Sequence, residues 1–170
     1  MVIVKAAKAA GGVFWHKRKP SNVTWPVCHI SDNSMLYIRI LYNILEGEHL
    51  HYGKNGYYMA SSGRVTWLDL FSAMAKALAK RKLIPSEEPA SARNADLEKM
   101  AVGIGCLKEV VVAHLSGSCK LMPEHGAHIG WKARYPAKHI LESADDEVEL
   151  ILGNLTSCEG TKTEDGNCEE

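Results

Sequence analysis

The 170-residue sequence has no excess of either charge, because 20 Lys and Arg residues balance 20 Asp and Glu residues. A neutral chain has no global field that would attract nucleic acid or anionic lipid. The sequence also lacks an apolar run of about 20 residues that could span a bilayer, and Lys5 and Lys8 interrupt the segment where a secretory signal would be apolar. These absences predict a soluble, cytoplasmic protein that binds neither nucleic acid nor membrane.

Motifs for nucleotide cofactors are missing as well. A doubly wound sheet holds a pyrophosphate on glycines that directly follow a strand, yet no G-x-G-x-x-G, G-x-x-G-x-x-G or G-x-x-x-x-G-K-[ST] occurs. No tyrosine has a lysine four residues later; Tyr135 and Lys138 come nearest. We therefore expect no cofactor on this chain alone and assign no catalytic residue.

The cysteines and histidines show no strong metal or redox pattern. Five cysteines are widely spread without a C-x-x-C pair, and Cys106 or Cys119 as a nucleophile has no recognisable base partner. The tightest possible metal group is Cys119 with His125 and His128, and a second pair is His49 and His51. Pro123 and Gly126 favour a loop around His125 and His128, so we expect an imidazole-rich surface loop and no metal site.

What is present indicates one globular α/β domain over residues 1–153, mainly helical with a few short strands. Hydrophobic residues make up 46% and charged residues 24% of the chain, which is close to globular averages. Apolar spacing and breakers predict helices at 2–10, 33–45 and 92–100, one that starts after Thr66 and stops before Pro85, and one between Pro136 and Gly153; the helix at 33–45 is expected to be mostly buried. Strands are expected at 13–15, 27–30 and 57–60, whereas 110–115 fits either state.

Helix ends carry the clearest local signals. Thr66, followed three residues later by Asp69, resembles a capping box, and Asp32 is expected to cap the helix that follows it. An apolar stripe then runs along the helix after Thr66, through Trp67, Phe71, Met74 and Leu78. Gly153 is expected to end the last helix, and residues 154–170 form an acidic tail that should be disordered.

Three stretches resemble one family. They read W-P-V-C-H-I-S-D at residues 25–32, G-Y-Y-M-A at 56–60 followed by V-T-W at 65–67, and I-G-W-K-A-R-Y-P at 129–136. In order and spacing these stretches are similar to the second half of extended short-chain dehydrogenase/reductases, most closely the fungal NAD(P)-dependent epimerase/dehydratase-like proteins. The resemblance runs from about residue 3 to residue 152.

The resemblance implies the C-terminal substrate-binding lobe of such an oxidoreductase, with the N-terminal Rossmann half absent. A truncated chain of this kind would be inactive alone, since the NAD(P) site and the Tyr and Lys that run hydride transfer belong to the missing half. Full-length relatives would move a hydride between NAD(P) and a carbonyl or hydroxyl carbon of a small-molecule substrate. The alternatives are a noncatalytic interaction module and, third, a small metal-binding protein that uses His125 and His128.

The same resemblance suggests substrate contacts at Trp25, His29, Tyr57 and Lys120. Lys120 stands where the family often places an arginine, and it is a point charge without the arginine fork. The structural alternative makes His29 a strand histidine and the two aromatics core residues. Loss of the cofactor half also predicts self-association near Phe14 and Trp15, on short strands with bare edges.

Overall fold

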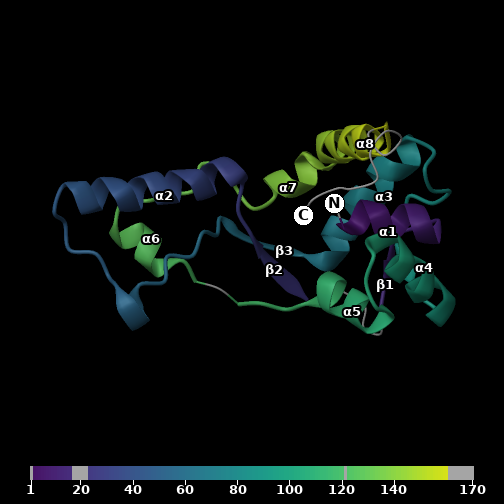
Figure 1. Ribbon diagram of the computed structural model, residues 1–170, viewed down its shortest axis with the longest axis horizontal. Helices are drawn as coiled ribbons and strands as arrows, with labels where there is room; N and C mark the ends of the chain where they lie inside the picture. The colour runs from purple at the N-terminus through teal and green to yellow at the C-terminus, as the bar shows by residue number, and fades with distance from the viewer. Residues whose placement is uncertain (1, 17–22, 121, 161–170) are drawn as a thin grey trace. The chain divides into compact units, whose positions relative to one another are not determined.

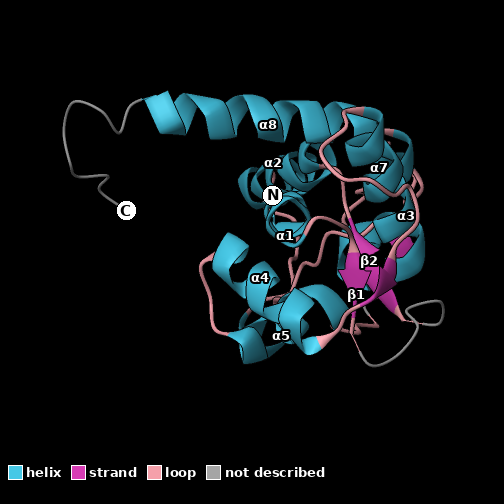
Figure 2. Cartoon of the chain, turned by 90° about the vertical axis from the view of Figure 1, so that its right-hand side faces the viewer, coloured by secondary structure: helices cyan, strands magenta, loops and turns pink. Residues whose placement is uncertain are grey.

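The computed structural model describes residues 2–16, 23–120 and 122–160, and these fold mainly into helices with a few short strands (Figure 2). The predicted α/β, mainly helical class is therefore confirmed. The chain forms two compact units, which are described separately. Unit 1 comprises Met1–Arg18, Phe71–Leu115 and Glu142–Glu170, and unit 2 comprises Lys19–Leu70 and Ser116–Leu141.

Unit 1 is a helical assembly with one small sheet. Its elements are α1 (Val2–Ala10), most of α3 (Trp67–Lys80), α4 (Asn94–Ile104), α5 (Lys108–Ser116), α8 (Ala144–Gly160), and β1 (Phe14–Trp15) paired in parallel with β4 (Ala90–Ser91). Helices α1 and α4 lie against each other, and Gly103 permits this contact because a Cβ there would lie 2.5 Å from the Cβ of Ala9. Phe71, Leu78 and Val148 are fully buried in this unit.

Unit 2 combines a two-stranded sheet with a long helix. Strand β2 (Thr24–Val27) pairs antiparallel with β3 (Gly63–Thr66), and α2 (Ile30–Leu45) follows β2 after two residues. The shorter helices are η2 (Gly53–Asn55), α6 (Glu124–His128) and α7 (His139–Glu142), the last of which ends in unit 1. Helix α6 lies beside α2 (Figure 1), where Gly126 approaches Leu36 and Trp131.

The structure confirms several predicted elements. The helix at 2–10, the strand at Phe14 and Trp15, and the helix that starts after Thr66 are all present. The ambiguous segment 110–115 is helical within α5. Each confirmed element has strong local signals, such as the Gly11-Gly12 pair after α1 and the threonine cap before α3.

Two predicted strands are wrong. The strand expected at 27–30 lies at Thr24–Val27, since the side chain of His29 caps α2 and the chain turns into the helix at Ile30. No strand forms at 57–60; the partner of β2 is instead Gly63–Thr66. Pro26 is tolerated in β2 because a two-stranded sheet leaves each strand one unpaired edge.

The predicted burial of the first long helix and the predicted end of the last helix are also wrong. Helix α2 buries Asp32 and Leu36 but exposes most of its apolar side chains. The last predicted helix is divided into α7 and α8, and α8 runs through Gly153 to Gly160. Residues 154–160 are therefore helical, whereas residues 161–170 of the expected disordered tail lie outside the described residues. Within the described residues, no helix is long and apolar enough to cross a membrane.

The N-terminus of α3 has the predicted cap. The Thr66 Oγ1 accepts a hydrogen bond from the Asp69 N–H at 3.0 Å and donates one to the Asp69 carboxylate at 2.6 Å. The stripe of Trp67, Phe71 and Met74 behind this cap is buried. The cap therefore satisfies a backbone N–H group in the first turn of α3.

We predict that Thr66→Ala lowers the free energy of unfolding by about 1 kcal/mol, because the N–H of Asp69 loses its acceptor. Urea denaturation followed by circular dichroism measures this loss. Thr66→Ser keeps the hydroxyl and is the matched control, with a midpoint near that of the wild type. Equal midpoints for the alanine and serine variants would contradict the capping role.

Ion pairs in unit 1 connect the C-terminus of α3 with the N-terminus of α8. Arg81 donates to the Asp145 carboxylate and, at 2.9 Å, to the Asp145 backbone carbonyl, and Lys80 lies 2.8 Å from the same carboxylate. The hydrogen bond from Arg81, with support from Lys80, lowers the pKa of Asp145 to about 2. The charges also suit both helix dipoles, since the cations lie at a C-terminus and the anion at an N-terminus.

We predict a loss of stability below pH 4 that depends on Asp145. A carboxyl group whose pKa is lower in the folded state stabilises the fold above its unfolded pKa of about 3.8, and this contribution disappears as the pH falls toward 2. Asp145→Asn should therefore be less stable than the wild type at pH 6 and should lose less stability between pH 4 and pH 2. Thermal melts at these pH values, with Asp146→Asn as control, test this; parallel pH profiles for wild type and Asp145→Asn would contradict it.

Candidate functional site

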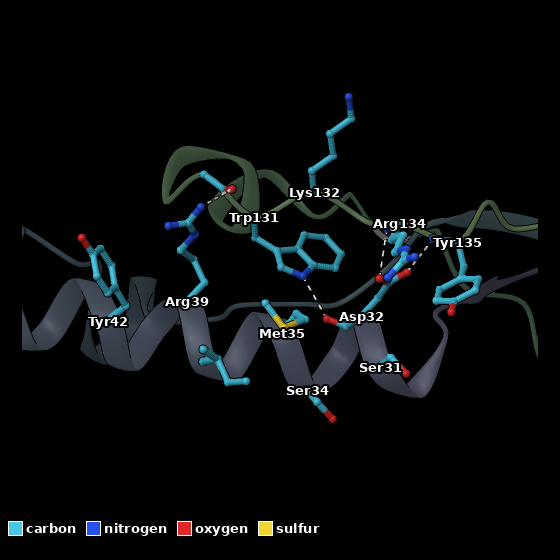
Figure 3. A pocket seen from close by; sticks show the side chains of 12 residues that line it. Ser31, Asp32, Ser34, Met35, Arg39, Tyr42, Trp131, Lys132, Arg134 and Tyr135 are labelled. Atoms are coloured by element: carbon cyan, nitrogen blue, oxygen red, sulfur yellow. Dashed lines mark hydrogen bonds between the residues drawn. The ribbon is translucent and has the colours of Figure 1, made fainter.

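The best-defined polar feature of unit 2 is the side chain of Asp32, which is only 3% exposed. One carboxylate oxygen accepts the backbone N–H of Arg134 at 3.0 Å, and the other accepts that of Tyr135 at 2.9 Å. The Trp131 indole N–H donates to the Asp32 backbone carbonyl at 2.9 Å. Asp32 thus joins the first turn of α2 to a loop about 100 residues away, and we call these contacts the Asp32 junction (Figure 3).

Asp32 does not cap α2 as predicted. The N-cap is His29, whose Nδ1 accepts the N–H of Ser31 at 3.2 Å. The His29 ring stacks on Tyr135 with centroids 4.0 Å apart, and the ring of His139 lies 5.5 Å away. With His29 at the cap position, the Asp32 carboxylate is available to the loop amides.

A groove of about 840 Å³ lies beside the junction, between α2 and residues 130–135 (Figure 3). Its charged side chains are Arg39, Lys132 and Arg134 together with Asp32. The remaining lining residues are Ser31, Ser34, Met35, Ile38, Tyr42, Gly130, Trp131 and Tyr135. Since both Asp32 oxygens already accept backbone N–H groups, the three cations dominate the charge that a ligand would meet.

The loop partly orients the cations of the groove. Arg39 donates to the Gly130 carbonyl at 3.4 Å, and its guanidinium lies 5.9 Å from the ring centroid of Tyr42. The Arg134 guanidinium lies 5.9 Å from the ring centroid of Tyr135. Each arginine is thus paired with an aromatic ring, an arrangement that suits a ligand with an anionic group and a flat apolar part.

The four predicted substrate contacts do not come together in this groove. Only His29 adjoins it, through its stacking on Tyr135. Trp25 packs near Trp67, with ring centroids 6.1 Å apart; Tyr57 is 67% exposed; and Lys120 is exposed in the segment after α5. None of Trp25, Tyr57 and Lys120 lines the groove. Sequence reasoning did not single out Arg39, which stands in no motif, or Arg134, although Arg134 lies in the stretch 129–136 that resembles the family.

Three histidines of unit 2 form a cluster, and two of them lie on a helix where a loop was expected. His125 and His128 lie on the short helix α6, and the ring of His51 stacks on that of His125 with centroids 4.6 Å apart. The His125 Nδ1 lies 3.0 Å from the Tyr57 carbonyl. Among the residues that the structure describes, no His, Cys, Asp or Glu group has the geometry to hold a metal ion.

The cysteine nearest the groove is not arranged as a nucleophile. Burial raises the pKa of the Cys28 thiol, and the nearby negative charge of Asp32 raises it further. A raised pKa keeps the thiol protonated, and the thiolate is the nucleophilic form. The groove therefore has the features of a binding surface more than those of a site for covalent chemistry.

No protein-family model, curated protein or solved structure matches this chain. The functional interpretation therefore depends on the geometry of the junction and the groove.

We predict that Asp32→Ala lowers the free energy of unfolding of unit 2 by roughly 2–4 kcal/mol, because two backbone N–H groups lose a charged acceptor. Hydrogen exchange at the amides of Arg134 and Tyr135 should accelerate together with this loss. Ser31→Ala, in the same helical turn, is the control and should change neither quantity. Unchanged protection of both amides in Asp32→Ala would show that the junction does not hold the loop.

Proposed function

We propose that this chain is a substrate-binding lobe of the kind found in extended short-chain dehydrogenase/reductases, and that it binds a small anionic molecule in the groove beside Asp32. The observation that carries the proposal is the Asp32 junction. It joins the segments 25–32 and 129–136, which are two of the three stretches that resemble the family. A contact between stretches that are far apart in sequence gives a physical reason for both to occur in one lobe.

The substrate class follows from the lining of the groove. Arginine presents a planar set of donors that matches a carboxylate or a phosphate, and Arg39, Arg134 and Lys132 offer three cations. Tyr42, Trp131 and Tyr135 add aromatic surface, and the volume is typical of a small-molecule site. A carboxylate or phosphate ester with a flat apolar body fits these features.

In this proposal the described residues do not bind a dinucleotide by themselves. A pyrophosphate site needs glycines that follow a strand and open a helix. In the described residues, six glycines adopt positive φ angles, and none of them directly follows a strand. Hydride transfer therefore needs a dinucleotide domain in addition to these residues, and in this proposal the chain alone binds and orients a substrate without converting it.

We predict that 1-naphthyl phosphate, as a probe of this class, binds the groove and shifts the NMR signal of the Trp131 indole N–H. Arg134→Gln should weaken binding about tenfold, because one charge-assisted contact is lost. Arg64→Gln is the matched control, since Arg64 is exposed on β3 and does not line the groove. A titration of the wild type and both variants measures the three dissociation constants.

Two outcomes would contradict the proposal. Equal affinities for 1-naphthyl phosphate and neutral 1-naphthol would show that the cations do not select the ligand. Saturable micromolar binding of NAD or NADP to the chain, measured by calorimetry, would contradict a lobe without its own cofactor site.

A noncatalytic interaction module is the second candidate function. The observation that favours it is the exposed apolar surface of α2, which carries eight of the 17 exposed large hydrophobic side chains of the described residues. Monomeric proteins rarely expose contiguous apolar patches of more than a few hundred Å². Three of these eight side chains, Met35, Ile38 and Tyr42, also line the cationic groove, whereas Ile30, Tyr37, Leu41, Ile44 and Leu45 do not.

A further inference from the structure

The outward face of α2 is apolar except at Ser34. Ile30, Tyr37, Leu41 and Ile44 are between 56% and 71% exposed, while Leu36 on the opposite side is buried. The self-association expected near Phe14 and Trp15 stays a prediction. Both residues are half-buried, and β1 is paired with β4, so the larger unpartnered apolar surface is on α2.

The exposed residues of α2 follow the spacing of a helix–helix interface. Ile30, Ser34, Tyr37, Leu41 and Ile44 succeed one another at intervals of four, three, four and three residues. This is the a/d spacing of a heptad repeat, which places side chains in one seam against a partner helix. We call these five residues the α2 seam.

The single polar member of the seam is satisfied within the helix. The Ser34 hydroxyl donates to the Ile30 carbonyl at 3.1 Å. Covering the seam with another apolar surface would therefore not leave this donor unpaired. The partner that suits the seam is an apolar helix of similar length.

Charge favours a second copy of α2 as that partner. The only charged residues of the helix are Asp32 and Arg39, and both bond to residues 130–135 on the other side. Ile38 and Leu45 flank the seam, so like charges would not oppose pairing of the helix with itself. Charged flanks would select a different, complementary chain.

The area reaches the lower limit for a specific dimer. Five large apolar residues of α2 that do not line the groove, namely Ile30, Tyr37, Leu41, Ile44 and Leu45, each expose more than half of their surface. At roughly 100 Å² apiece they offer on the order of 500 Å² per chain, or about 1,000 Å² for two chains, which is the size that a specific interface needs.

We propose that two copies of this chain associate through their α2 seams, with the helices antiparallel and a two-fold axis at Tyr37. In this register Ile30 faces Ile44 of the second copy, and Ser34 faces Leu41. The antiparallel arrangement opposes the helix dipoles and keeps the two Ser34 residues apart. The inference does not depend on the proposed substrate class.

The first experiment measures the molar mass by sedimentation over a range of protein concentrations. The wild type should reach twice the 18.7 kDa chain mass at tens of micromolar. Leu41→Lys should raise the dissociation constant at least about 100-fold, because the symmetric interface contains the change twice and each change is worth about tenfold. Val102→Lys, at an 83% exposed position of α4, is the control and should leave the dimer intact.

A second experiment separates a lost interface from a misfolded chain. Tyr37→Lys and Tyr37→Glu should each be monomeric, and their equimolar mixture should form a heterodimer, which a folding defect cannot produce. The double variant Ser34→Glu/Leu41→Lys should dimerise again, since opposite charges face each other only in the antiparallel register. A monomeric wild type, a mixture without heterodimer, or a double variant that stays monomeric would overturn the proposal.

Discussion

The placement of the Asp32 carboxylate is the constraint on which unit 2 depends. A buried carboxylate is costly unless its charge is met by donors, and here both oxygens accept backbone N–H groups from residues 134 and 135. The loop can satisfy this charge only in the register that also brings the Trp131 indole N–H to the Asp32 carbonyl. One buried charge thus determines where a distant loop attaches to α2.

The rest of the site follows from this attachment. Trp131 lies on the inner side of α2, close to α6. Gly126 in α6 permits this close approach, because a Cβ at that position would lie 3.0 Å from the Trp131 ring. The negative charge of Asp32 is directed at backbone amides. The groove is therefore left with the cations of Arg39, Lys132 and Arg134.

Local signals in the sequence predicted part of this fold correctly. The Thr66 cap, the buried stripe of α3 and the helix before Gly11 depend on neighbouring residues, so sequence reasoning could find them. The cap of α2 was assigned wrongly, because His29 and Asp32 both stand where a cap could form. The backbone N–H groups of Arg134 and Tyr135, about 100 residues away, bind the Asp32 carboxylate, and His29 is left to cap the helix. Likewise, Gly126 predicted a loop because glycine disfavours helices, whereas in the structure it lies in α6 and permits the close approach of Trp131.

The apolar pattern of α2 shows why the site could be predicted only in part. Hydrophobic residues occur on nearly all sides of this helix, and such a helix is normally buried on all sides. The pattern therefore predicted burial correctly for Leu36 and wrongly for Leu41 and Ile44, since the sequence alone does not show which sides of the helix the rest of the chain covers. Unit 2 covers the side that carries Leu36 and Asp32, whereas the heptad-spaced side is exposed. The groove and the seam are thus two consequences of one helix whose apolar surface exceeds what its own unit covers.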